Sequence, residues 1–175
     1  GSDTGGSIRQ PASFTGTYGL KPTYGRISRF GLIAYASSFD QIGPFANSTK
    51  DIALLLQIMA GEDGDDSTAS SKEVPNYLDG QLANKLKIAV LQESLETDGM
   101  DAEIVAKMKA LIAQLEAKGH KVELVSFPYL KYVVPTYYVL TTAEASSNLS
   151  RYDGVHFGYR SATASGVEET YKKSR

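Results

Sequence analysis

The sequence has no cysteine, which excludes a disulfide framework and a metal site built on thiolates. Its only two histidines, His120 and His156, are too far apart in sequence to indicate a metal cluster, so no metal ligands are assigned. No apolar run is long enough to span a bilayer and no signal peptide opens the chain, which predicts a cytoplasmic protein without a membrane partner. Neither sign of charge dominates, because 18 basic residues stand against 20 acidic ones, and direct nucleic-acid binding is therefore not indicated.

The composition is that of a globular domain. The chain has 175 residues, 42% of them hydrophobic, which is enough for one domain with its own core. Residues 86–91 have the pattern of a buried strand, 101–118 form a helical pattern with one apolar stripe, and 121–125 alternate like a second strand. This strand–helix–strand order predicts a βαβ-like unit over 86–125, and hence an α/β fold in which helices cover a mixed sheet.

The rest of the chain is expected to alternate helices with connecting segments. Residues 48–59 predict a helix with Ser48 as its N-cap, and residues 128–152 become helical after a run of aromatic residues. The acidic, serine-rich stretch 62–85 is typical of a solvated connector, and the polar stretch 161–175 is expected to be mobile.

The chain opens on GSDTGGSIRQPA, residues 1–12, in which Gly5 and Gly6 precede Ser7. Glycines let successive backbone N–H groups converge on one point, and a serine that leads into a helix lies where the helix N-terminus adds partial positive charge. Such a loop can hold an activated hydroxyl beside an oxyanion hole. The same string also fits an ordinary turn in which Ser7 caps a helix, and the loop alone leaves both interpretations open.

Taken whole, residues 1–12 resemble the second half of the amidase signature, which marks a family of serine hydrolases that act on amides. The family uses a Ser–cis-Ser–Lys triad, and the resemblance implies that Ser7 is the acyl-ester nucleophile. It also implies an oxyanion hole made of the backbone N–H groups of Thr4, Gly5, Gly6 and Ser7. The family's second serine and its lysine lie upstream of this string. We therefore expect one partial amidase domain over 1–175 that lacks its proton-transfer partners and is inactive by itself.

Three acidic and basic residues near the loop are expected to be structural. Asp3 and Arg9 flank the nucleophile loop and predict a supporting pair that fixes its shape. Asp40, which precedes the string QIGP, is interpreted as a turn residue and not as a catalytic acid.

The basic residues that follow the loop allow two functional interpretations, and neither is favoured. Lys21 is a conceivable base for Ser7, but a surface or salt-bridging lysine is the preferred interpretation. Lys21, Arg26 and Arg29 also suggest a phosphate site, yet the GxxxxGK[ST] order of a P-loop is missing.

Two further stretches resemble one branch of the family, the A subunits of glutamyl-tRNA(Gln) amidotransferase. They are residues 20–44, with the strings LKPTYGRISRFG and ASSFDQIGP, and residues 142–160, with TAEASSNLSRYDG. The resemblance implies a glutaminase that releases ammonia from glutamine. It further implies B and C partner subunits, of which the B subunit uses ATP and Mg²⁺ to amidate Glu-tRNA(Gln). The chain itself is expected to bind no cofactor and to meet the tRNA only through the complex.

The segment 128–160 carries the remaining candidates of this resemblance. A tyrosine at the start of its helix is expected to line the glutamine pocket; Tyr138 is the candidate, its neighbour Tyr137 is the alternative, and a core tyrosine is an equally good account. The polar set Asn148, Arg151 and Asp153 predicts either a helix-capping network or an interface with a partner subunit.

Two other functions stay open at this point. One is an amidase of the same family that hydrolyses a small or aryl amide without any tRNA partner. The other is a non-catalytic binding module whose glycine-rich loop binds an anion.

Overall fold

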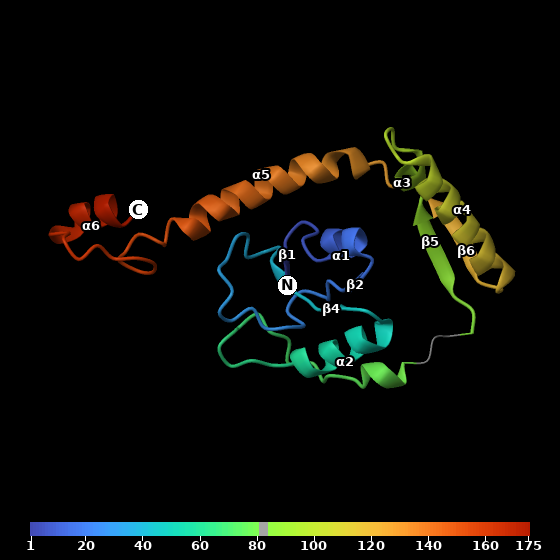
Figure 1. Cartoon of the computed structure of the whole chain (residues 1–175), viewed down its shortest axis with the longest axis horizontal. Coiled ribbons are helices and arrows are strands. Elements are labelled where there is room, and N and C mark those ends of the chain that lie inside the picture. Colours follow the sequence, from blue (N-terminus) through green and yellow to red (C-terminus); the bar gives the residue numbers. More distant parts are fainter. Residues whose placement is uncertain (81–83) are drawn as a thin grey trace. The chain divides into compact units, whose positions relative to one another are not determined.

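The computed structural model describes residues 1–80 and 84–175, and its backbone divides into two compact units (Figure 1). Unit 1 comprises Gly1–Gly80 and Tyr137–Arg175, and unit 2 comprises Gln81–Thr136. The expected connector 62–85 therefore lies partly outside the described residues, at 81–83. The single partial domain expected over 1–175 stays a prediction.

The first 46 residues of unit 1 fold back on themselves through two short antiparallel pairs of strands. The strands are β1 (Ser2–Asp3), β2 (Tyr18–Gly19), β3 (Gln41–Ile42) and β4 (Phe45–Ala46). β1 pairs with β3, so that Asp3 is opposite Gln41, and β2 pairs with β4. The pairing places the loop that follows β1 next to the turn that precedes β3.

The helices of unit 1 begin and end at local signals. α1 (Arg9–Thr15) ends at Gly16, whose φ of 65° is the left-handed conformation that glycine adopts without strain. α2 (Thr49–Met59) begins after Ser48, whose side chain accepts a hydrogen bond from the Asp51 N–H at 3.1 Å. The Ser48 cap was predicted from the sequence and is confirmed. The buried apolar residues of the unit are Ile8, Ala12, Ile27, Ala36, Leu56 and Ala145.

Two segments of unit 1 contain local structure that the sequence did not indicate. Residues 161–175, which were expected to be mobile, contain α6 (Gly166–Ser174), and the Ser161 N–H donates to Ser174 Oγ at 3.1 Å. The described part of the connector, 62–80, has no buried residue, as expected of a solvated segment, and Arg26 donates to the Lys72 and Glu73 carbonyls, both at 2.9 Å. It ends in a single 3₁₀ turn, η1 (Tyr77–Asp79).

Unit 2 is a strand–helix–strand unit. β5 (Lys87–Leu91) and β6 (Lys121–Val125) pair in parallel, and α3 (Glu93–Glu96) and α4 (Ala102–Ala117) connect them. This is the order that the sequence predicted for 86–125, and with the antiparallel pairs of unit 1 it makes the chain an α/β fold with parallel and antiparallel pairing. β5 was expected to be buried but is only half-buried on alternate residues, because a sheet of two strands has little to cover it.

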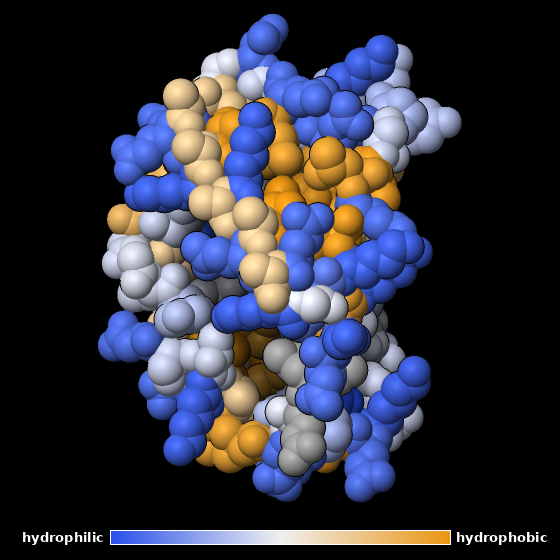
Figure 2. Space-filling view, turned by 90° about the vertical axis from the view of Figure 1, so that its right-hand side faces the viewer, coloured by the Kyte–Doolittle hydropathy of each residue, from blue (hydrophilic) through white to orange (hydrophobic). Residues whose placement is uncertain are grey.

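The apolar stripe of α4 divides into two faces. Val105, Ile112 and Leu115 are half-buried, whereas Ile104, Met108 and Leu111 are exposed by 53, 37 and 45%. Figure 2 shows apolar residues gathered among charged ones on the side of the molecule that it presents. The sequence predicted one continuous core-facing stripe, and only half of it packs within the unit.

α5 (Leu130–Leu149) begins in unit 2 and continues in unit 1, with Pro135 inside it. No helix in the described residues is both long and apolar enough to cross a membrane.

Candidate active site

The nucleophile loop comprises residues 4–8, between the end of β1 and the start of α1. Ser7 is exposed and lies two residues before α1, and Gly6 before it has a φ of 128°, which strains any residue with a side chain. The Gln10 N–H donates to the Gly6 carbonyl at 2.7 Å, so the helical turn begins at the loop itself. The sequence therefore presents the Ser7 hydroxyl to solvent from a tightly turned backbone.

The buried carboxylate of Asp3 accepts hydrogen bonds from the backbone of this loop. Asp3 is fully buried, and its side chain accepts hydrogen bonds from the Gly6 N–H at 2.8 Å and the Ile8 N–H at 3.3 Å. Arg9 grips the same carboxylate through Nε at 3.0 Å and Nη2 at 3.1 Å. Burial raises the pKa of Asp3, but the hydrogen bonds from Arg9, Gly6 and Ile8 outweigh it, and the pKa lies below its ordinary value. Asp3 and Arg9 thus form the ion pair that the sequence predicted.

One of these hydrogen bonds involves a predicted oxyanion donor. Of the four expected donors, the Gly6 N–H already donates to Asp3 and is turned into the loop. An N–H committed to a buried carboxylate is a poor donor to a second acceptor, and the role expected for Gly6 stays a prediction. The roles expected for Thr4, Gly5 and Ser7 stay predictions.

The Thr4 side chain faces a second buried carboxylate, that of Asp40. Thr4 Oγ1 donates to Asp40 Oδ1 at 2.5 Å, and Asp40 is only 3% exposed. Asp40 Oδ2 accepts from the N–H groups of Tyr35 and Ala36 at 2.8 and 2.9 Å. These two bonds close a turn, as expected of Asp40, whereas the contact with Thr4 has no signal in the local sequence.

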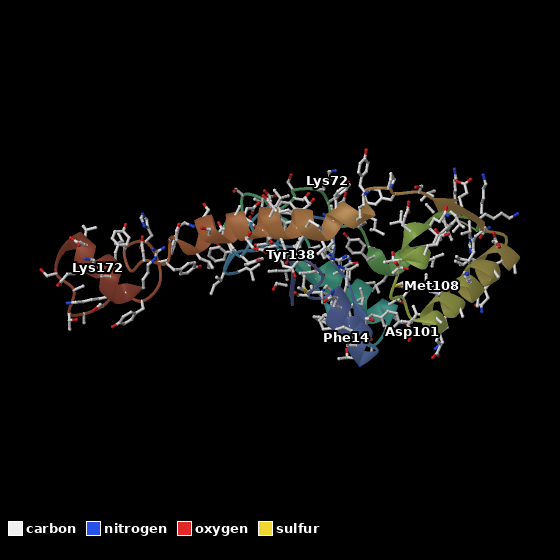
Figure 3. The ribbon with its side chains drawn as sticks, turned by 90° about the horizontal axis from the view of Figure 1, so that it is seen from above. Phe14, Lys72, Asp101, Met108, Tyr138 and Lys172 are labelled. Atoms are coloured by element: carbon white, nitrogen blue, oxygen red, sulfur yellow. The ribbon has the colours of Figure 1, made fainter. Side chains whose placement is uncertain are left out.

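The tyrosine that reaches the loop is Tyr137. A Cβ built on Gly5 would stand 2.6 Å from Cε2 and Cζ of the Tyr137 ring, so only glycine leaves room for this ring. Tyr138, the candidate favoured from the sequence, is 59% exposed on α5 (Figure 3). Burial raises the pKa of Tyr137, helped by the neighbouring Tyr35, so its phenol stays protonated at neutral pH and can donate a hydrogen bond.

Other side chains considered from the sequence have structural partners. Lys21 Nζ donates to the Pro22 carbonyl at 3.0 Å and lies near the Gln41 amide, which fits the structural interpretation and not a base for Ser7. Arg26 and Arg29, which had suggested a phosphate site, donate to backbone carbonyls of their own unit.

Two of the polar residues at the end of α5, Asn148 and Arg151, are joined by hydrogen bonds, and the third, Asp153, closes a turn after the helix. Arg151 donates to the Asn148 carbonyl at 3.3 Å and to its side chain at 2.9 Å. Asn148 Nδ2 donates in turn to the Tyr35 carbonyl at 3.2 Å, and Asp153 accepts from the N–H groups of Val155 and His156. The hydrogen bonds to His156 and Val155 lower the pKa of Asp153 to about 2.

Unit 1 also holds an open cavity of about 470 Å³ beside the turn that Asp40 closes. Charges of both signs line it, from Arg29 and Arg151 and from Asp65 and Asp66. Within the residues that the structure describes, no group of His, Cys, Asp and Glu side chains is placed to hold a metal ion.

The loop presents an exposed serine, Ser7, on an α/β scaffold. The sequence matches the Amidase family over residues 1–175, and the chain belongs to that family.

Curated relatives with high sequence identity are A subunits of glutamyl-tRNA(Gln) amidotransferase. The chain is 52% identical over its whole length to the A subunit of glutamyl-tRNA(Gln) amidotransferase from Koribacter versatilis, and 51% identical to that from Streptococcus sanguinis. It spans only a little over a third of these relatives, 37% and 36% of their lengths.

Solved structures agree with the sequence comparison. The chain is similar to the A subunit of the Thermotoga maritima glutamyl-tRNA(Gln) amidotransferase, with a TM-score of 0.74 and 42% identity over 85% of this chain and 33% of that one. It is also similar to the peptide amidase of Stenotrophomonas maltophilia, with a TM-score of 0.71 and 30% identity over 89% of this chain and 33% of that one.

Proposed function

We propose that this chain carries the nucleophile of a glutaminase, the A subunit of a glutamyl-tRNA(Gln) amidotransferase. The observation that supports this most strongly is that the entire chain is 52% identical to the A subunit from Koribacter versatilis. Among solved structures, identity to the Thermotoga maritima A subunit is 42%, whereas identity to the peptide amidase is 30%. The loop geometry agrees with it, because Ser7 is exposed on a backbone that Asp3 and Arg9 hold in place.

The proposed reaction is acyl transfer through Ser7. Ser7 Oγ attacks the side-chain amide carbon of glutamine, and the N–H groups of Thr4, Gly5 and Ser7 stabilise the oxyanion that forms. The hydroxyl proton passes to the leaving nitrogen, the C–N bond breaks, and ammonia departs. Water then hydrolyses the glutamyl ester, which releases glutamate and restores the Ser7 hydroxyl.

The proton transfer needs a base, and the family resemblance assigns it to a serine and a lysine outside these 175 residues. Tyr137, kept protonated beside Gly5, is the residue that we propose for the glutamine pocket in place of Tyr138.

The proposed partners follow from the same branch. The released ammonia would pass to a B subunit that uses ATP and Mg²⁺ to convert Glu-tRNA(Gln) to Gln-tRNA(Gln), with a C subunit completing a heterotrimer in the cytoplasm. This chain would bind glutamine but neither the nucleotide nor the metal ion.

The decisive experiment measures ammonia release from glutamine in a protein of the relatives' full length that carries this chain, assembled with its B and C subunits. Ser7→Ala is expected to lower the rate to background, since the other hydroxyl of the loop, that of Thr4, is bonded to the buried Asp40. Ser2→Ala is a matched control, because Ser2 is also exposed and lies in β1. Equal ammonia release by the wild type and Ser7→Ala would exclude Ser7 from the chemistry and favour a non-catalytic binding module.

A second candidate is a hydrolase of other amides, favoured by the structural similarity to a peptide amidase. It predicts that the same preparation hydrolyses small or aryl amides through Ser7, without stimulation by B and C subunits. Turnover of glutamine alone, dependent on those subunits, would exclude it.

A further inference from the structure

We propose that Asp40 is a positioning residue for the nucleophile loop, acting through the Thr4 hydroxyl. The inference rests on the proposed function, because it concerns the donors that face the Ser7 acyl centre. Asp40 comes from the turn before β3, 36 residues from Thr4 in sequence, yet its buried carboxylate accepts the Thr4 hydroxyl directly.

The bond has a defined direction. Asp40 Oδ2 is occupied by the N–H groups of Tyr35 and Ala36, which leaves Oδ1 for Thr4. A carboxylate only accepts hydrogen bonds, so the Thr4 hydroxyl must donate, and its side chain is fixed in one orientation. The Thr4 backbone, which carries an expected oxyanion donor, is fixed with it.

The turn that carries Asp40 is itself braced from other elements of unit 1. The Ser38 N–H donates to Glu144 Oε2 at 2.9 Å, and Asn148 Nδ2 donates to the Tyr35 carbonyl at 3.2 Å, so α5 holds the turn on one side. Arg29 Nη1 donates to the Asp40 carbonyl at 3.3 Å. A carboxylate on so constrained a turn is a rigid point of attachment, which a positioning residue requires.

The loop therefore has two anchors with different tasks. Asp3 holds the inward N–H groups of Gly6 and Ile8, on the Ser7 side of the loop. Asp40 holds the opposite end through a side chain, and it leaves the Thr4 N–H uncommitted to either carboxylate. Rigid placement of an oxyanion donor matters, because catalysis depends on donors that are in position before charge develops.

Substitutions at Thr4 test this directly, since any side chain there retains the backbone N–H. Thr4→Val keeps the shape but removes the hydroxyl, and Thr4→Ser keeps the hydroxyl. The probe is a fluorophosphonate, which forms a bond between Ser7 Oγ and phosphorus with loss of fluoride and places an oxygen in the oxyanion hole. The protein is one of the relatives' full length that carries this chain.

We expect Thr4→Val to slow Ser7 labelling about 10- to 100-fold, the range that small displacements of a catalytic group produce, and Thr4→Ser to restore most of the rate. With glutamine, Thr4→Val should lower kcat and leave KM within about twofold, because the bond acts on the transition state. The labelling rate of Asp40→Asn should lie between those of the wild type and Thr4→Val, because its amide can still contact the Thr4 hydroxyl, but without charge. The Asp40→Asn/Thr4→Val double variant should be no slower than Thr4→Val, since both changes act on one bond.

Asp153→Asn is the matched control, because Asp153 is also buried in unit 1 and also accepts from two backbone N–H groups. It should label at the wild-type rate. Wild-type labelling of Thr4→Val, or equal slowing of Asp153→Asn, would overturn the inference about Asp40 and leave the proposed nucleophile intact. Absence of Ser7 labelling in the wild type would overturn the proposed function and this inference together. If Thr4→Val does not fold, Asp40→Asn against Asp153→Asn makes the same comparison.

Discussion

The ring of Tyr137 occupies the space that a side chain on Gly5 would need. A Cβ there would stand 2.6 Å from two ring carbons and 2.7 Å from the phenol oxygen. Gly5 does not have a positive φ, in contrast to Gly6, so its lack of a side chain serves close approach and not backbone conformation. The two adjacent glycines of the loop are therefore required for different reasons.

Gly5→Ala is accordingly expected to displace either the Tyr137 ring or the loop. We expect Ser7 labelling by a fluorophosphonate to slow by about 100-fold, the cost of roughly 1 Å of misplacement at a catalytic group. Adding Tyr137→Ala to Gly5→Ala should recover part of the rate, because it removes the atoms that clash. Gly64→Ala is the control, since a Cβ at Gly64 meets nothing within 4 Å. Unchanged labelling in Gly5→Ala would contradict the close contact.

The paired nitrogens of Arg9 predict that lysine cannot replace it. Nε and Nη2 both reach the Asp3 carboxylate, and a lysine offers one ammonium group without this fork geometry. Because the Arg9 side chain is 54% exposed, solvent screens the pair, and Arg9→Lys should cost only about 1 kcal/mol of unfolding free energy. Hydrogen exchange at the Gly6 and Ile8 amides should nevertheless quicken, whereas the exposed Arg160→Lys should leave it unchanged. If these amides exchange as slowly in Arg9→Lys as in the wild type, Asp3 alone holds the loop.

The depressed pKa of Asp3 predicts an acid-sensitive loop. Its folded pKa lies below the ordinary 3.8, so the charged carboxylate stabilises the fold above about pH 3.8 and loses this effect as the pH falls through the folded value. The difference in unfolding free energy between wild type and Asp3→Asn should be constant from about pH 8 to about pH 5 and narrow below about pH 4. Urea unfolding across this range measures it, with the exposed Asp98→Asn as control. A difference that widens on acidification would contradict the sign of the shift.

The features that could be predicted from the sequence are those whose cause lies within a few residues. Ser48 caps α2 through an N–H three residues on, and Gly16 ends α1 through its own φ. The Asp3–Arg9 pair spans six residues, and the parallel pairing of β5 and β6 follows from the strand–helix–strand order. Each of these needs only local chemistry or a short connection.

The features that the sequence left open or did not show depend on how distant segments pack. Successive helical residues point about 100° apart, so whether Tyr137 or Tyr138 faces the loop is set by the rotation of α5 against it and not by either residue. The Thr4–Asp40 bond joins positions 36 apart, with no motif linking them. Half of the α4 stripe is exposed, although its periodicity is the same as that of the half that packs.

One arginine, Arg26, makes three hydrogen bonds to the connector between residues 62 and 80. Arg26 Nε donates to the Tyr77 hydroxyl at 2.7 Å, while its two terminal nitrogens donate to the carbonyls of Lys72 and Glu73 at 2.9 Å. Arg26→Ala removes three hydrogen bonds from charged donors, which contribute about 1.5 kcal/mol or more each before solvent screening of this partly exposed site.

Limited proteolysis should therefore cut the connector of Arg26→Ala faster than that of the wild type, by at least about tenfold where local opening precedes cleavage. The connector of Arg26→Lys should be cut at a rate between those of the wild type and Arg26→Ala, because a lysine can satisfy one carbonyl but not the three acceptors together. Arg160→Ala, at an exposed position of the same unit, should be cut at the wild-type rate. Equal cleavage of all four proteins would mean that the connector is held by its remaining contacts, chiefly the Ser70 N–H to the Gly25 carbonyl at 2.7 Å and the Tyr77 N–H to Gln57 at 2.9 Å.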